Sequence, residues 1–292
     1  MATLAEWVEG ARPRTLPAAV APVLAGSGVA WFEGGFDLRL ATLALAVALA
    51  LQIGVNFAND YSDGIRGTDA ARVGPMRLVG SGSAGPAAVK AAAFGCFAVA
   101  AVAGLVVVIL TGHWWLLGVG AAAILAAWYY TGGRRPYGYR GWGEVFVFIF
   151  FGLVAVAGTA YIQVGTVSAA AWWTAIAIGA LACAILVANN LRDLDGDRAA
   201  GKHTLATRLG DQGTRWFFLA LVALALLGVL GVALSSSWWA LLGWLMILLV
   251  VVPVRQILAG GTGRALIPVL KQTGLAELAC AAGLFVGLVI AR

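Results

Sequence analysis

"LATLALAVALALQIGVNFANDYSDGIRGTD" occupies residues 40–69 and joins a long apolar run directly to a cluster of acidic residues. Residues 40–58 carry no charged side chain, whereas Asp60, Asp63 and Asp69 follow closely. About 20 apolar residues are enough to cross a bilayer as a helix, and ionised carboxylates are disfavoured in its hydrocarbon. The stretch therefore predicts a membrane-spanning helix that ends in an acidic cluster at the membrane surface.

The whole chain has the composition of a membrane protein. Its 292 residues are 62% hydrophobic and only 11% charged, whereas about 25% charge is usual in soluble domains. Strand-length segments of alternating polarity are absent, which leaves helices as the spanning elements. We therefore expect an all-α membrane protein with nine transmembrane helices in one bundle and a single domain over 1–292. The expected spans are 15–32, 39–58, 88–110, 114–131, 144–164, 170–190, 215–234, 237–258 and 273–291.

The basic residues lie on one side of these nine spans. Of the 19 Lys and Arg, all except Arg39 and Arg292 fall before span one or around the connections after spans two, four, six and eight. The positive-inside rule then places the N-terminus on the cytoplasmic face of the plasma membrane, together with two Asp-rich loops that we expect after spans two and six. The net charge of +6 accordingly indicates contact with lipid headgroups or a phosphorylated substrate, and not with nucleic acid.

A second acidic cluster, "ANNLRDLDGDRAAGKHTLATRLG" at 188–210, follows span six as the first follows span two. Asn189 and Asp193 repeat the i, i+4 spacing of Asn56 and Asp60. On a helix, Asp60 shares a face with Asp63, and Asp193 with Asp197. Asp69 and Asp195 do not share a helix face with these pairs. Their roles, and that of His203, stay open.

Paired carboxylates near hydrocarbon need a compensating cation. Mg²⁺ suits them, because it takes oxygen ligands and is often shared between carboxylates and substrate phosphates. We therefore expect two Mg²⁺ ions, held by Asp60, Asp63, Asp193 and Asp197, to bind a diphosphate between the clusters. The simpler alternative is that each Asp caps a helix or pairs with a nearby Arg, but matched clusters on the basic face favour a metal site.

These residues resemble the UbiA superfamily of intramembrane prenyltransferases, whose two Asp-rich motifs are similar to "NDYSD" and "NNLRDLDGD" with "GKHTLATRLG". Within it, the chain is most similar to the bacterial branch that prenylates 1,4-dihydroxy-2-naphthoate in menaquinone synthesis. The stretches that carry this closer resemblance are 11–26, 74–82 and 130–159. The resemblance implies that a polyprenyl diphosphate ionises and that an aromatic acid captures the allylic cation, with release of diphosphate and CO₂ and formation of demethylmenaquinone.

That chemistry assigns further candidate residues. Cations must stabilise the departing diphosphate, and a dry aromatic pocket must protect the allylic cation from water. We expect the acceptor's carboxylate near Arg14 and its phenol proton near Tyr139 or Glu144. The remaining candidates are Lys202, Arg72 and Arg135 for the diphosphate, Asn56, Asn59 and Asn189 as neutral donors, and Phe146 and Phe150 for the pocket.

Three alternatives stay open at this stage. The acceptor could be 4-hydroxybenzoate, homogentisate or a porphyrin derivative. A CDP-alcohol phosphotransferase would also place Asp clusters at the membrane edge, but Gly67 and Thr68 stand where its motif needs Ala and Arg. A divalent-cation transporter is disfavoured, because its sites are expected near the midplane of the membrane.

Overall fold

The computed structural model describes residues 2–67 and 76–292, and every regular element within them is helical. The chain begins with α1 (Leu4–Gly10), a short turn η1 (Pro13–Thr15) and α2 (Pro17–Phe32). The remaining elements, in chain order, are α3 (Leu38–Arg66), α4 (Pro86–Thr111), α5 (Leu116–Tyr129), η2 (Tyr137–Arg140), α6 (Gly143–Val147), the π-helix η3 (Phe148–Ala157), α7 (Gly158–Val164), α8 (Ala169–Arg192), α9 (Leu194–Ala199), α10 (Leu205–Ser235), η4 (Trp238–Met246), α11 (Ile247–Leu258), η5 (Gly263–Leu266) and α12 (Ile267–Ile290).

Among the described residues, seven helices are long and apolar enough to cross a membrane. An eighth span results if α1 with η1 and the following α2, which are bent by 49°, count as one. The expected span 114–131 corresponds to α5, which has only 14 residues and reaches about 21 Å at 1.5 Å per residue. The all-helical membrane fold is thus confirmed, with seven or eight spans by length.

The helix boundaries correct one part of the sequence prediction. We expected the Asp residues in loops, but α3 continues through Asp60 and Asp63 to Arg66. Asp193 lies in the turn between α8 and the short helix α9, at the N-cap position of α9, and Asp197 lies within α9. Asp60, Asp63 and Asp197 are therefore helical, whereas Asp193 is not. Asp69 and Arg72 lie outside the described residues.

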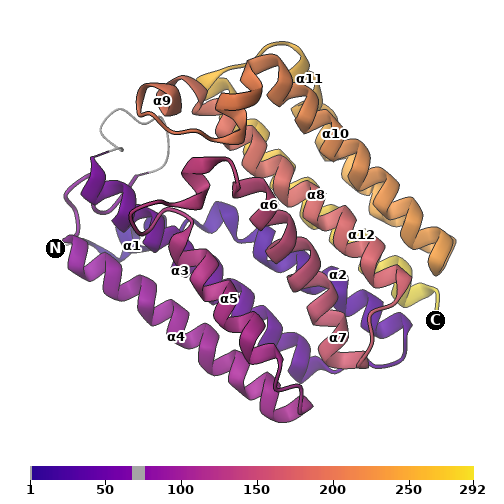
Figure 1. The fold of residues 1–292 in the computed structure, drawn as a ribbon. Coiled ribbons are helices and arrows are strands. Elements are labelled where there is room, and N and C mark those ends of the chain that lie inside the picture. The colour runs from indigo at the N-terminus through magenta and orange to yellow at the C-terminus, as the bar shows by residue number, and fades with distance from the viewer. Residues whose placement is uncertain (1, 68–75) are drawn as a thin grey trace.

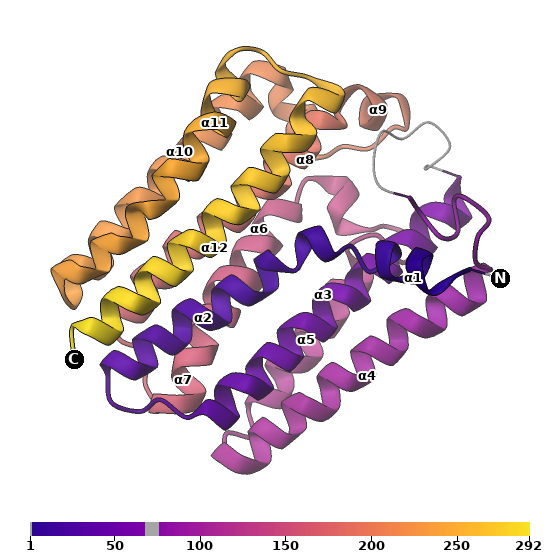
Figure 2. The same cartoon turned by 180° about the vertical axis from the view of Figure 1, so that it is seen from behind.

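The bundle has two packed groups of helices. The larger group contains α2, η3, α8, α10 and α12. Its central helix is α8, which contacts the other four, and 72% of the most apolar 18-residue stretch of α8 is buried. In the smaller group, α3 packs along α4, and only 17% of the most apolar 18-residue stretch of α3 is buried. Two separate apolar cores reflect this division. Figures 1 and 2 show α1 and α9 at the same end of the bundle, one beside each group.

Small residues permit the closest helix contacts. A Cβ atom built on Gly287 of α12 would lie 2.1 Å from the carbonyl oxygen of Trp239, so only glycine lets these backbones approach. Close approach of this kind is a common basis of helix association in membranes.

We predict that Gly287→Val destabilises the protein by about 2–3 kcal/mol through overpacking, which corresponds to a midpoint of thermal unfolding lower by roughly 5–10 °C. Gly95→Val is the matched control, because nothing lies within 4 Å of a Cβ at Gly95, within α4. Thermal unfolding of both variants in detergent measures the difference. Equal midpoints would contradict this account of the packing.

Candidate active site

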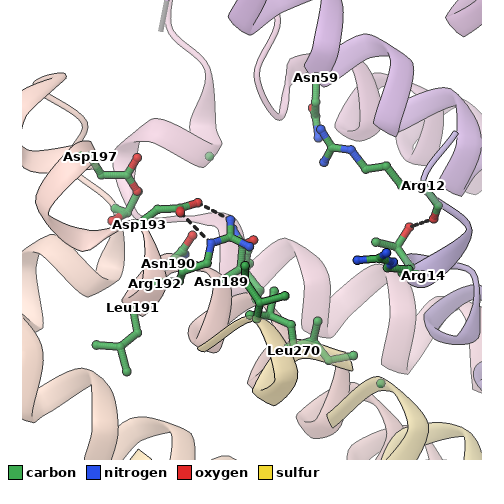
Figure 3. A pocket seen from close by; sticks show the side chains of 18 of the residues that line it. Arg12, Arg14, Asn59, Asn189, Asn190, Leu191, Arg192, Asp193, Asp197 and Leu270 are labelled. Atoms are coloured by element: carbon green, nitrogen blue, oxygen red, sulfur yellow. Dashed lines mark hydrogen bonds and ion pairs between the residues drawn. The ribbon is translucent and has the colours of Figure 1, made fainter. Parts of the chain in front are cut away.

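A cavity of about 1850 Å³ is lined by residues of both helix groups and both acidic clusters. Its walls include α1, η1 and α3 on one side and α8, α9 and the start of α12 on the other. Figure 3 shows Arg12, Arg14 and Asn59 across the cavity from Arg192 and Asp193. The fold thus brings together the two clusters that the sequence pairs.

In the first cluster, Asp60 and Asp63 have different surroundings. The carboxylate of Asp60 accepts hydrogen bonds from the backbone N–H groups of Leu78 (2.7 Å) and Val79 (3.0 Å), and it is not among the residues that line the cavity. Asp63 lines the cavity and accepts from Arg77 Nη2 at 3.1 Å. Asp60 therefore fixes the backbone that presents Arg77 to Asp63.

In the second cluster, each cavity-lining carboxylate is paired with a basic side chain. Arg192 donates two hydrogen bonds to Asp193, of 2.7 and 2.6 Å, with both side chains largely buried. Lys202 Nζ lies 3.5 Å from Asp197 Oδ1. Asp195 also lines the cavity, but its side chain is 98% exposed, in agreement with its place off the Asp193–Asp197 face.

The donor set suits a hard divalent cation, because it consists of carboxylate and amide oxygens with no thiol or imidazole. No three acidic, His or Cys side chains of the described residues gather closely enough to hold a metal ion by themselves. Mg²⁺ commonly binds through one or two carboxylates and completes its ligands with water and substrate phosphate. The cavity therefore fits Mg²⁺ that arrives with, or is completed by, a phosphorylated ligand.

Tyr139, which we expected near the acceptor's phenol proton, contacts both acidic clusters. Its hydroxyl donates to Asp63, and its ring lies 4.6 Å from Lys202 Nζ. The backbone carbonyl of Tyr139 accepts a hydrogen bond from the N–H of His203 at 2.9 Å. The segment that follows α9 is thereby fixed against η2, which carries Tyr139.

The two motif asparagines are not equivalent, which corrects the symmetry that we inferred from their spacing. Asn56 Nδ2 donates to the carbonyl of Ala11 and to Thr15 Oγ1, each at 3.0 Å, and does not line the cavity. Asn189 does line it. Asn56 thus anchors the chain before α2 to α3, because the two repeats meet different neighbours.

The structure gives Asn59 and Glu144 hydrogen-bond partners that the sequence did not predict. Asn59 lines the cavity and accepts from Thr131 Oγ1 at 2.7 Å. Glu144 is buried and absent from the lining, but its Oε1 accepts from Asn190 Nδ2 at 2.9 Å. Asn190, which does line the cavity, therefore lies between Glu144 and any ligand.

Only some of the predicted basic side chains line the cavity. Lys202 and Arg14 line the cavity, whereas Arg135 is exposed and absent from the lining. Sequence reasoning did not single out Arg77, Arg192 or Arg12, which do line it. The place of Arg192 directly before Asp193 was the available signal, since adjacent opposite charges in an apolar context favour a local pair.

The aromatic side chains predicted for the pocket, Phe146 and Phe150, lie outside the cavity lining. Phe146 stacks on Tyr137 with ring centroids 4.1 Å apart and on Phe150 at 6.2 Å, and neither Phe lines the cavity. Val147 and Phe151 do. The run "FVFIFF" is apolar on every face, so its sequence gave no direction.

The chain matches the model of the UbiA prenyltransferase family over residues 19–266. It is 53% identical to a 1,4-dihydroxy-2-naphthoate octaprenyltransferase of Mycobacterium tuberculosis (strain ATCC 25618 / H37Rv), over 95% of this chain and 94% of that protein. The Escherichia coli (strain K12) protein of the same name is 38% identical, over 91% of this chain and 89% of that one.

Solved structures share the fold at low sequence identity. An apo UbiA homolog from Aeropyrum pernix K1 has a TM-score of 0.73 and 17% identity, covering 92% of this chain and 97% of that one. A UbiA homolog from Archaeoglobus fulgidus bound to GPP and Mg²⁺ has a TM-score of 0.67 and 14% identity, covering 95% of this chain and 99% of that one. These likenesses confirm the helical architecture.

We predict that Arg192→Ala destabilises the protein by about 2 kcal/mol, because it removes the bidentate partner of the buried Asp193. Added Mg²⁺ should raise the unfolding midpoint of this variant more than that of the wild type, since the ion replaces the lost charge. Arg39→Ala is the control, because the Arg39 side chain that pairs with Asp37 is 81% exposed. The same Mg²⁺ response in all three proteins would argue against a cation site at Asp193.

Proposed function

The chain belongs to the UbiA prenyltransferase family, and from this premise we propose that it transfers a polyprenyl chain from polyprenyl diphosphate to 1,4-dihydroxy-2-naphthoate. Diphosphate and CO₂ are released, and demethylmenaquinone is formed. The observation that carries the proposal is one cavity bounded by paired carboxylates and basic side chains of both Asp-rich clusters, in a chain 53% identical to a protein named for this reaction.

Our proposed site binds the diphosphate between the two clusters. Asp63, Asp193 and Asp197 would hold two Mg²⁺ ions, with Asp60 joining them if its hydrogen bonds to the backbone of residues 78 and 79 are exchanged. Bound there, the ions would neutralise the charge that develops on the leaving diphosphate. Lys202, Arg77 and Arg192 lie among these carboxylates and would pair with the diphosphate oxygens. Arg135 stays a prediction that the described contacts do not support, and Arg72 stays a prediction that lies outside the described residues.

The acceptor and the allylic cation require different surroundings. Arg14 on η1 would pair with the acceptor's carboxylate, and Val147 and Phe151 would exclude water from the cationic carbon. Asn190, oriented by Glu144, would position the acceptor, and Tyr139 would receive or relay its phenol proton. Phe146 and Phe150 would pack behind Val147 and Phe151, because Phe146 stacks both on Tyr137 and on Phe150.

The alternatives lose support to different degrees. Membership of the UbiA family excludes the phosphotransferase, and a transporter has no support from relatives that are named as transferases. Another acceptor, such as 4-hydroxybenzoate, uses the same chemistry and is the alternative that an assay must test.

The proposed topology has nine spans in a single domain over 1–292, with α5 as the shortest span. The N-terminus and the end of the bundle that carries α1 and α9 would face the cytoplasm across the plasma membrane, because the basic residues gather there. In this topology the two acidic clusters would lie at the cytoplasmic surface, where soluble acceptors and diphosphate are exchanged.

Product formation tests the function directly. Purified protein with Mg²⁺, 1,4-dihydroxy-2-naphthoate and a polyprenyl diphosphate should yield demethylmenaquinone by mass spectrometry, and EDTA should abolish it. Asp63→Asn and Asp193→Asn should each lower kcat/KM by at least about 100-fold, or roughly 2.7 kcal/mol. Asp195→Asn, at an exposed position of the same cluster, should stay within about threefold. Product from 4-hydroxybenzoate but none from the naphthoate would overturn the acceptor.

Cysteine labelling tests the orientation. Ala200→Cys, beside α9, and Thr166→Cys, in the turn between α7 and α8, are exposed at opposite ends of the bundle. In a Cys96→Ser background, a membrane-impermeant maleimide should label residue 166 on intact cells and residue 200 only after permeabilisation. The reverse order would overturn the proposed topology.

A further inference from the structure

A glutamine in α3 presents a buried carbonyl oxygen that the catalytic scheme above does not use. Gln52 is only 8% exposed and lines the cavity. Its Nε2 donates to Thr15 Oγ1 at 3.0 Å, whereas its Oε1 has no hydrogen-bond partner among the described residues. A buried acceptor without a donor costs about 1–3 kcal/mol, so such a group in a cavity points to a donor that arrives with a ligand.

The hydrogen-bond network fixes which atom of the amide faces the cavity. The hydroxyl of Thr15 donates its only hydrogen to the carbonyl of Arg12 at 2.9 Å. It must therefore accept from its other two partners, Gln52 Nε2 and Asn56 Nδ2, each at 3.0 Å. A flipped Gln52 would place two acceptors against each other. Oε1 is thus the atom left for a ligand.

The position of Gln52 separates it from the diphosphate region. It precedes Asp63 by eleven residues on α3, or about 16 Å along the helix axis, so it lies in the part of the cavity nearer the membrane interior. Through Thr15 it is bonded to η1, the same short segment that carries Arg14. A ligand whose carboxylate pairs with Arg14 would therefore lie in the same cavity as Gln52, beside the segment to which Gln52 is bonded.

The chemistry of the acceptor supplies the missing donor. In 1,4-dihydroxy-2-naphthoate, the 1-hydroxyl adjoins the carboxylate and bonds to it internally, while the 4-hydroxyl has no such partner. We propose that Gln52 Oε1 accepts the hydrogen bond of the 4-hydroxyl and so selects acceptors that carry it. This inference rests on the proposed function and adds to it a residue that determines acceptor specificity.

Binding of two acceptors to two proteins tests the proposal. We expect wild type, without prenyl diphosphate and under anaerobic conditions, to bind 1,4-dihydroxy-2-naphthoate about tenfold more tightly than 1-hydroxy-2-naphthoate, since the latter leaves Oε1 unpaired. Gln52→Met keeps the length of the side chain without its carbonyl and should bind both with equal Kd. The KM for polyprenyl diphosphate should stay within about twofold of wild type, which reports an intact fold.

Thr15→Ser is the matched control. It keeps the hydroxyl that accepts from Gln52 Nε2 and orients the amide, so it should keep the tenfold preference. If Gln52→Met does not fold, Gln52→Asn withdraws the carbonyl by one methylene and should lose the preference equally. A tenfold preference that persists in the Gln52 variants, or none in wild type, would overturn the inference while product formation stands. Failure of wild type to prenylate any naphthoate would overturn the proposed function itself.

Discussion

Charge compensation at the edge of a hydrocarbon layer is the constraint on which the site depends. A carboxylate there is costly unless a cation or several hydrogen-bond donors accompany it. Asp193 lies against Arg192, Asp197 against Lys202, and Asp63 against Arg77 and Tyr139. In the proposed function, the basic side chains of these pairs would also bind the departing diphosphate. Compensation of the buried carboxylates and stabilisation of the leaving group would thus use one set of residues.

The division of the bundle into two packed groups makes the cavity possible. Each acidic cluster ends a long helix of one group, α3 in the smaller and α8 in the larger, so the clusters meet only where the groups face each other. Tyr139 stabilises this junction through its contacts with Asp63 and Lys202. Asn56 does so through its hydrogen bonds to Ala11 and Thr15. A carboxylate pair on a single helix could not surround a diphosphate in this way.

The aromatic wall illustrates where sequence reasoning stops. The density of Phe in 146–151 correctly marked a helix that borders the cavity, but not which side chains face it. Gly152 approaches α8 so closely that its Cβ would lie 2.8 Å from Gly179 Cα, and this contact sets the rotation of the helix. Phe151 therefore turns to the cavity and Phe146 to Tyr137. No periodicity in a uniformly apolar run carries that information.

The sequence by itself determined the membrane class, the all-helical fold, the family and the pairing of the two acidic clusters. These follow from local properties, namely the length of apolar runs, the sign of the charges between them and the spacing of short motifs. Only the tertiary structure decided that Asn56 bonds to η1 while Asn189 lines the cavity, that Glu144 accepts a hydrogen bond from Asn190, and that Gln52 has a buried carbonyl oxygen. Each depends on which neighbour a side chain meets across the bundle, and helix rotation and packing set that neighbour after the spans have formed.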